Sequence, residues 1–102
     1  MEKVIRDGKV AVLYSPGYGA GWYSWHNHLE AVFSPEIVAL VEQEKHDEIT
    51  DELCEKLFGE GYYKGARNLM IKWIKEGDSF RINEYDGNES IEIIGPSSYI
   101  VA

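Results

Sequence analysis

A strand pattern opens the chain. Residues 3–14 (KVIRDGKVAVLY) hold two runs rich in valine and isoleucine on either side of Asp7-Gly8, a dipeptide that suits the positive φ angles of a tight turn. Pro16 then ends the second run, because proline has no N–H for a strand ladder. The pattern predicts a β-hairpin.

Two helices are predicted in the middle of the chain. Ser34-Pro35 is typical of a helix start, because serine caps free backbone N–H groups and proline suits the first helical position. Apolar residues at helical spacing continue from there to about Lys45. A second helix is predicted to begin at Thr50 and to end at Gly59.

The last third of the chain returns to strand patterns. Three segments show them: 68–74 (NLMIKWI), 79–85 (SFRINEY) and 90–95 (SIEIIG). A helix stays open as an alternative for the first of them. Glycine-containing turns at 76–78 and at Asp86-Gly87 separate the three segments. We expect the residues from Pro96 onward to form a tail.

The order of these elements predicts a fold class. Two strands, two helices and three strands follow one another, without the alternation of strands and helices that is typical of a parallel sheet. We therefore predict an α+β fold, with an antiparallel sheet in ββ-αα-βββ order and two helices packed on one face. A chain of 102 residues is expected to form a single compact domain, 1–102.

The segment that these patterns leave unexplained is 14–28, YSPGYGAGWYSWHNH. It combines three glycines at alternate positions with five aromatic residues and two histidines. Its continuation is ambiguous, because residues 22–33 fit either an extended segment or a turn that runs into a short helix near Leu29. We weigh three functions for it: a phosphate-binding loop, a metal site and a recognition surface.

The glycine spacing argues against a phosphate-binding loop. The dinucleotide fingerprint needs G-x-G-x-x-G at the start of a helix within a βαβ unit. Here Gly17, Gly19 and Gly21 place the third glycine one position early, and Trp-Tyr-Ser-Trp follows. The Walker pattern lacks its Gly-Lys-Ser/Thr. The glycines are better explained as sharp bends beside bulky rings, and we predict no cofactor.

Metal and catalytic sites have little support. On an extended segment His26, His28 and Glu30 would face one side, a set that suits non-haem iron, but surface positions explain the three equally well. Cys54 belongs to the apolar side of the second helix, where a thiol acts as a small hydrophobic residue and acidic neighbours disfavour a reactive thiolate. We predict no metal and no catalytic residue.

Recognition is the function that this segment supports best. Aromatic side chains offer a large contact area at modest entropic cost, and on a loop they could stack on a planar ligand or anchor a protein partner. We expect Tyr14 and one tryptophan to belong to the core, and a homo-oligomer contact stays open for the remaining rings. The predicted ligand-binding residues come from this segment and from a second glycine-rich loop: Tyr18, Trp22, Trp25, His26, Asn27, His28, Lys64 and Arg67.

The charge distribution narrows the range of partners. A net charge of −8 disfavours direct nucleic-acid binding, which needs Lys and Arg to neutralise phosphates. No Lys or Arg occurs from Val10 to Glu44, whereas residues 42–60 hold eight acids against two lysines. That acidic stretch is either a solvated helix surface or a surface that imitates nucleic-acid charge toward a host protein.

The remaining composition bears on the compartment. A single cysteine excludes an internal disulfide and favours a reducing environment. No apolar run is long enough to span a bilayer, and residues 1–7 (MEKVIRD) lack the apolar run of a signal peptide. We therefore expect a soluble cytoplasmic protein with no membrane partner.

Two segments carry a resemblance to a known family. Residues 9–25 (KVAVLYSPGYGAGWYSW) and 84–91 (EYDGNESI) are similar to segments of a family of small uncharacterised proteins from bacterial genomes, prophages and phages. The resemblance implies no activity and no catalytic residues. A phage setting would favour a counter-defence factor in the host cytoplasm that binds a host protein or sequesters a nucleotide signal.

One leading hypothesis and two alternatives follow. The leading hypothesis is a small non-enzymatic binding protein that takes a nucleotide-type ligand, cyclic or ADP-ribose-like in its sharpest form, through the aromatic and glycine-rich segment. The first alternative is an acidic inhibitor that contacts a host protein through 42–60. The second is a small enzyme that depends on His26 and His28.

Overall fold

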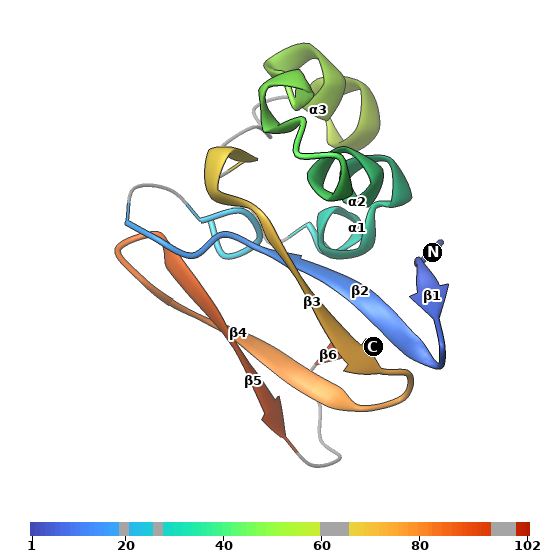
Figure 1. The fold of residues 1–102 in the computed structure, drawn as a ribbon. Helices are drawn as coiled ribbons and strands as arrows, with labels where there is room; N and C mark the ends of the chain where they lie inside the picture. The colour runs from blue at the N-terminus through green and yellow to red at the C-terminus, as the bar shows by residue number, and fades with distance from the viewer. Residues whose placement is uncertain (19–20, 26–27, 60–65, 95–99) are drawn as a thin grey trace.

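The chain folds into three layers. The computed structural model describes residues 1–18, 21–25, 28–59, 66–94 and 100–102. Within them the helices lie on one side of a first three-stranded sheet, and a second three-stranded sheet lies on the other side (Figure 1). The predicted α+β class is confirmed, with two sheets where we expected one.

The first sheet contains the predicted hairpin. Strands β1 (Ile5–Arg6) and β2 (Lys9–Tyr14) pair antiparallel, and β3 (Met70–Lys75) pairs antiparallel with the other edge of β2. Asp7 and Gly8 have φ angles of 51° and 75°, which are the positive values that a tight two-residue hairpin turn needs. The segment for which a helix stayed open is therefore a strand.

The second sheet is built around the last predicted hairpin. Strands β4 (Ser79–Tyr85) and β5 (Asn88–Ile94) pair antiparallel along their whole length. The turn between them again has two positive φ angles, 52° at Asp86 and 84° at Gly87. The predicted turn residues are therefore confirmed at both hairpins.

The end of the chain differs from the expected tail. Residues 100–101 form strand β6 (Ile100–Val101), which pairs antiparallel with the start of β4, so that Ile100 lies opposite Phe80. Ala102 is buried, and its N–H donates to the carbonyl of Asp78 at 3.0 Å. The prediction of a tail is wrong for these last residues, because two apolar side chains complete the edge of a sheet.

The helices begin where the sequence predicts. The helical elements are α1 (Leu29–Phe33), α2 (Pro35–Glu42), α3 (Asp51–Phe58) and the short 3₁₀ turns η1 (His46–Glu48) and η2 (Ala66–Asn68). The Ser34 hydroxyl accepts the N–H of Ile37 at 3.4 Å, and the Thr50 hydroxyl accepts the N–H of Leu53 at 3.2 Å. Both predicted N-caps are confirmed. No helix in the described part of the chain is long and apolar enough to cross a membrane.

Two helix details differ from the expectation. A short helix, α1, settles the ambiguity of residues 22–33. The helix α2 ends at Glu42 rather than near Lys45. Glu44 adopts a left-handed conformation with a φ of 58°, and the N–H of Lys45 donates to the carbonyl of Leu40 at 2.8 Å. This turn closes the helix without the glycine that usually marks such an end.

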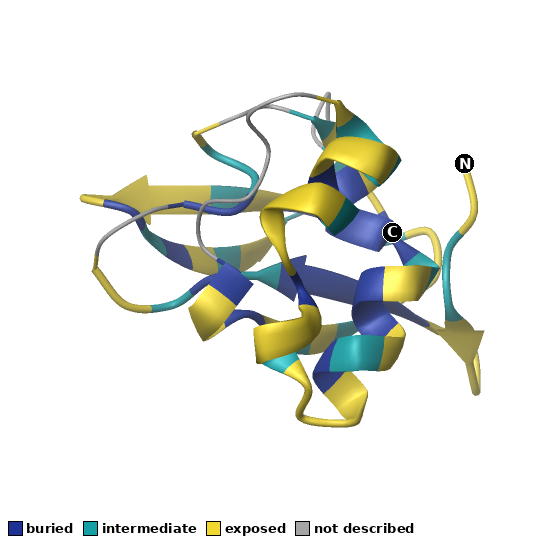
Figure 2. Cartoon of the chain, turned by 90° about the horizontal axis from the view of Figure 1, so that it is seen from above, coloured by how far each residue is buried: buried dark blue, intermediate teal, exposed yellow. Residues whose placement is uncertain are grey.

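Strand β2 is buried on both faces, and this explains the three layers. Ala11 and Leu13 belong to the hydrophobic cluster under the helices, whereas Val10 and Val12 belong to the cluster between the two sheets. A strand without polar alternation is typical of a sheet covered on both sides. Figure 2 shows the buried residues gathered in the interior and the exposed ones on the outer turns of the helices.

Candidate functional site

The aromatic segment folds around a buried carboxylate from another strand. Glu89 of β5 is only 1% exposed. Its Oε1 accepts the N–H of Ser15 at 2.9 Å and lies 3.4 Å from the Ser15 hydroxyl oxygen. Its Oε2 accepts the N–H groups of Tyr23 and Ser24 and the hydroxyl of Ser24, each at 2.8 Å. One side chain thus joins both ends of the segment.

Backbone contacts strengthen this junction. The N–H of Glu89 donates to the carbonyl of Ser15 at 2.9 Å. The N–H of Gly17 donates to the side-chain oxygen of Asn88 at 2.8 Å. The start of β5 therefore holds the segment through its backbone as well as through the carboxylate.

Gly21 lets the segment close on this carboxylate. A Cβ atom at Gly21 would lie 2.2 Å from the Ser24 hydroxyl oxygen and 3.1 Å from Oε2 of Glu89. Backbone N–H groups and hydroxyls around an anion are also what a phosphate-binding loop supplies. In this protein the anion is the side chain of Glu89. The glycine at position 21 therefore allows the segment to bind an internal carboxylate and not an external phosphate.

Sequence reasoning missed Glu89, although the strand pattern contains a signal for it. Side chains two positions apart share a face of a strand, and Glu89 therefore shares a face of β5 with Ile91 and Ile93. Across the pair, that face continues with Phe80 and Ile82 of β4. Glu84 lies opposite Glu89 on this face, but on β5 itself an acid in line with apolar residues indicates a carboxylate that is buried with its own hydrogen-bond donors.

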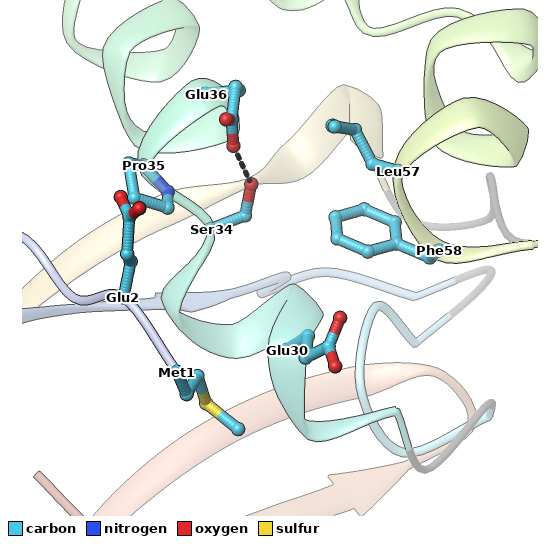
Figure 3. Close-up of a pocket in the computed structure, with 8 residues that line it drawn as sticks. All are labelled: Met1, Glu2, Glu30, Ser34, Pro35, Glu36, Leu57 and Phe58. Carbon is cyan, nitrogen blue, oxygen red and sulfur yellow. Dashed lines mark hydrogen bonds between the residues drawn. The ribbon is translucent and has the colours of Figure 1, made fainter.

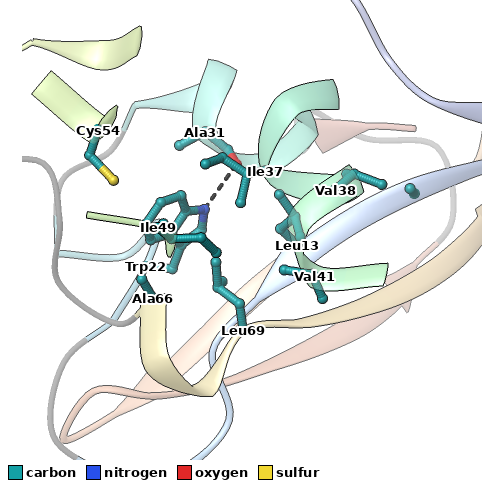
Figure 4. Packing of buried hydrophobic residues seen from close by; sticks show 11 residues of the cluster. Leu13, Trp22, Ala31, Ile37, Val38, Val41, Ile49, Cys54, Ala66 and Leu69 are labelled. Atoms are coloured by element: carbon teal, nitrogen blue, oxygen red, sulfur yellow. Dashed lines mark hydrogen bonds between the residues drawn. The ribbon is translucent and has the colours of Figure 1, made fainter. Parts of the chain in front are cut away.

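Trp22 belongs to the core, which corrects its assignment to a ligand-binding site. Its side chain is 0% exposed, and its indole N–H donates to the carbonyl of Ala31 at 2.9 Å (Figure 4). The ring meets Phe58 edge-on with centroids 6.0 Å apart. A fully buried indole with its N–H satisfied cannot stack on a ligand. Trp22 is the tryptophan that we expected in the core, whereas Tyr14 is only half-buried.

Two rings of the segment are exposed, and one of them meets a third exposed ring. Tyr18 and Trp25 are 67% and 47% exposed, and Tyr85 at the end of β4 is 75% exposed. The rings of Tyr18 and Tyr85 meet edge-on with centroids 6.4 Å apart. The indole N–H of Trp25 donates to Glu84 at 3.2 Å. We call Tyr18, Trp25 and Tyr85 the aromatic patch.

The aromatic patch carries negative charge. Glu84 accepts the N–H of Gly87 at 2.6 Å and the indole N–H of Trp25. These two hydrogen bonds, the one from Gly87 first, hold the pKa of the Glu84 carboxyl below its ordinary value of 4.5. Asp86 occupies the adjacent turn and is exposed. The Glu84 carboxylate therefore lies beside the Trp25 ring, and Asp86 adds a second acid next to Tyr85 in the chain.

The structure places some of the other predicted residues. His28 is half-buried, with its Nε2 3.7 Å from a carboxylate oxygen of Glu30 and its ring 5.8 Å from the Phe58 ring. His28 therefore faces the helices and not the aromatic patch. His26 and Asn27 lie outside the described residues.

The 3₁₀ turn η2, at the end of the second glycine-rich loop, lies beside the aromatic segment. A Cβ atom at Gly17 would lie 3.5 Å from the side-chain nitrogen of Asn68, so η2 lies beside the aromatic segment. Arg67 precedes Asn68 and is exposed. Lys64 lies outside the described residues.

Metal ligands and the cysteine were the remaining chemistry to place within the described residues. No group of three or more His, Cys, Asp and Glu side chains that could hold a metal ion occurs there. Cys54 is buried, and burial, aided by the charge of Asp51, raises the pKa of its thiol to about 11. A thiol in this state is protonated at neutral pH and serves packing.

A surface hollow of about 220 Å³ lies between α1, the start of α2 and the end of α3 (Figure 3). Its lining combines three acids with apolar side chains: Met1, Glu2, Glu30, Ser34, Pro35, Glu36, Leu57 and Phe58. Ser34 and Glu36 are hydrogen-bonded to each other at 3.2 Å. Small-molecule sites usually exceed about 300 Å³, so the volume of this hollow does not indicate a ligand.

The described part of the acidic stretch 42–60 is exposed, as both interpretations of the sequence predict. Its described acids are all exposed: Glu42, Glu44, Asp47, Glu48, Asp51, Glu52 and Glu55. Glu42 is paired with Arg6, and Glu48 lies 3.9 Å from Lys45. Glu60 lies outside the described residues.

Comparison with known proteins adds no relative. No known family matches the chain, and no curated protein or solved structure matches it either. The resemblance to a phage and prophage family therefore stays a prediction, and the function has to be argued from the geometry of this chain.

Proposed function

We propose that the chain is a non-enzymatic binding protein whose contact surface is the aromatic patch. One observation carries the proposal: Tyr18, Trp25 and Tyr85 are exposed, while the backbone beneath them is fastened to β5 by Glu89. Large exposed rings cost a protein solubility unless they serve a contact. An anchored backbone keeps them in position without a partner.

Anchoring makes such rings effective in binding. Binding is weakened when side chains and loops must become ordered at the interface, because ordering them costs entropy. A preformed surface avoids much of this cost. Tyr and Trp add large contact areas with only two side-chain torsions each, and they dominate interface hot spots. The edge-on contact between Tyr18 and Tyr85 restricts both rings further.

The charge of the patch favours a protein partner with basic side chains. Glu84 accepts the indole N–H of Trp25, and the exposed Asp86 follows Tyr85 in the chain. A guanidinium or ammonium group can pair with such carboxylates and stack on the rings at once. The same carboxylates repel phosphate. The partner class that fits best is therefore a protein segment in which Arg or Lys adjoins apolar residues.

The nucleotide-type ligand predicted from the sequence has less support at this surface. The ring of Trp22 is buried in the core and is not available to stack on a nucleotide. Of the two predicted cations, Arg67 lies in the described part of the chain. The counter-defence role depends on the family resemblance alone and stays a prediction.

Selection from a random peptide library tests the proposal. We expect the wild-type chain to enrich peptides that carry Arg or Lys beside apolar residues. Binding of these peptides, measured by calorimetry, should weaken about tenfold or more in Trp25→Ala and in Tyr85→Ala, as expected for interface hot spots. It should also weaken as salt rises.

A matched control separates the patch from the remaining surface. Met70 is 51% exposed on β3, so Met70→Ala removes a large exposed apolar side chain outside the aromatic patch and should leave peptide binding unchanged. Enriched peptides that are acidic, or that bind Trp25→Ala and Tyr85→Ala as well as the wild type, would contradict the proposal. Calorimetry with cyclic and ADP-ribose-like nucleotides serves as the parallel test of the sequence-based hypothesis.

The acidic surface 42–60 supports a second candidate function. Its described acids are exposed, and Lys45 and Lys56 are the basic residues within that range. Such a surface fits an inhibitor of a basic protein, whose affinity would fall steeply with salt and would not respond to Trp25→Ala. Charge reversal at Asp47 and Asp51 together should weaken such binding and leave selected peptides on the aromatic patch unaffected.

A further inference from the structure

We propose that a cavity at the opposite end of β2 and β3 binds a nucleoside monophosphate, through Trp73 and Arg6 for the base and Lys9 for the phosphate. The cavity measures about 320 Å³ and is lined by Arg6, Asp7, Lys9 and Trp73. This volume is within the range of small-molecule sites, roughly 300–1,000 Å³. None of these residues belongs to the aromatic patch, so the inference is independent of the proposed function.

Strand register gathers basic side chains at this cavity. Arg6 lies opposite Lys9 in the β1–β2 pair, and Lys9 lies opposite Lys75 in the β2–β3 pair. Residues directly opposite each other share a face of the sheet, and like charges in such pairs are destabilising. Arg6 is paired with Glu42, so in a chain with a net charge of −8 the adjacent Lys9 and Lys75 supply the local positive charge that favours an anion.

The planar surfaces for a base lie next to these cations. The guanidinium carbon of Arg6 lies 5.4 Å from the centre of the Trp73 ring. Arg6 also pairs with the carboxylate of Glu42 in α2 through both terminal nitrogens, one of them at 2.9 Å. The pairing neutralises both side chains and favours this placement of Arg6, so the indole and the guanidinium lie together as a surface for stacking.

Asp7 provides the third feature that this ligand needs. It occupies the tight β1–β2 turn with a φ of 51° and lines the same cavity as Lys9. A carboxylate there can accept hydrogen bonds from sugar hydroxyls, as acids do in other nucleotide sites. With Lys9 for the phosphate, Lys75 opposite it in the β2–β3 pair outside the cavity lining, and Asp7 for the sugar, each part of a nucleoside monophosphate has a group of complementary chemistry.

Calorimetry with AMP, GMP, adenosine and inorganic phosphate tests this site. We expect the monophosphates to bind, and adenosine and phosphate each to bind about tenfold more weakly or worse, because each lacks one of the two anchors. Lys9→Gln should weaken AMP binding about fivefold or more, since it removes a phosphate contact. Trp73→Leu should weaken binding of AMP and leave that of phosphate unchanged.

Matched controls make each outcome decisive. Lys72 lies on the same strand as Trp73 but on the opposite face, opposite Val12, so Lys72→Gln should leave AMP binding unchanged, as should Trp25→Ala. Circular dichroism verifies folding, and Asp7→Asn replaces Trp73→Leu if that variant does not fold. Absence of AMP binding at millimolar concentration, or AMP binding that Lys9→Gln leaves intact or Lys72→Gln weakens equally, would overturn the inference.

Discussion

Trp22 and Trp25 lie three positions apart in one segment, yet they belong to different parts of the molecule. Trp22 is completely buried and donates its indole N–H to a main-chain carbonyl of α1. Trp25 is 47% exposed and donates its indole N–H to a carboxylate at the tip of the β4–β5 hairpin. The inner half of the aromatic segment builds the core, and the outer half presents rings to solvent.

The difference between the two halves originates outside the segment. Glu89 lies 65 positions from Ser24 in the chain, and its carboxylate holds both Ser15 and Ser24. Between these two anchor points Trp22 is directed under the helices, and beyond Ser24 the chain emerges at Trp25. The composition of the segment alone therefore could not distinguish the core ring from the contact ring.

The largest effect is expected for the two tryptophans themselves. Trp22→Ala should lower the free energy of unfolding by about 4 kcal/mol, because it leaves a large cavity in the core. Trp25→Ala should lower it by less than about 1 kcal/mol, because the ring is half exposed. Urea unfolding of both variants measures the difference. Equal losses would contradict the division of the segment into an inner and an outer half.

The next largest loss of stability is expected for substitution of Glu89, the carboxylate that anchors the segment. Glu89→Gln places an amide NH₂ where a carboxylate oxygen accepts hydrogen bonds, so buried donors lose their acceptor and the free energy of unfolding should fall by about 3 kcal/mol. Glu92→Gln is the matched control on the same strand. It breaks an exposed pair with Arg81 and should cost less than about 1 kcal/mol. The anchoring role fails if the two variants unfold at the same urea concentration.

The glycines give a smaller contrast. Gly21→Ala should cost about 2 kcal/mol, because its Cβ would collide with the Ser24 hydroxyl. Gly17→Ala meets only ordinary contacts and should cost about 1 kcal/mol for its positive φ. Thermal or urea unfolding ranks the two. A reversed order would show that the segment does not close on Glu89 as described.

The smallest effect is a pH response confined to the outer half. Since the pKa of Glu84 is lowered in the folded protein, its hydrogen bonds contribute stability that is present above its ordinary pKa and lost as pH falls through the folded value. The indole N–H resonance of Trp25 should therefore shift below pH 4.5, while that of Trp22 stays constant. A Trp25 resonance that responds to pH only at or above 4.5 would contradict a hydrogen bond that lowers the pKa of Glu84.

Local patterns predicted the parts of the fold that depend on neighbouring residues. Asp7-Gly8 and Asp86-Gly87 were identified as turns from their tolerance of positive φ, and Ser34 and Thr50 as helix caps from their hydroxyls. Each depends on interactions within four positions. For the same reason, the existence of both hairpins and of two helices could be predicted.

Features that depend on distant residues could not be predicted in the same way. The second sheet forms where Val10 and Val12 pack against residues far away in the sequence, among them Phe80 of β4, and β6 pairs with the edge of β4. In the candidate site, Tyr18 and Trp25 were identified from their chemistry. Tyr85 and Glu89 were missed because they approach the segment only through the fold.

Hydrogen exchange at the amides of Tyr23 and Ser24 tests the central claim most directly. Both N–H groups donate to Glu89, so we predict that they exchange as slowly as ladder amides of β4 and β5 in the wild type. In Glu89→Gln they should exchange far faster, while amides in the middle of β2 keep their protection. Exchange of Tyr23 and Ser24 at the rate of an unstructured peptide in the wild-type protein would contradict the account.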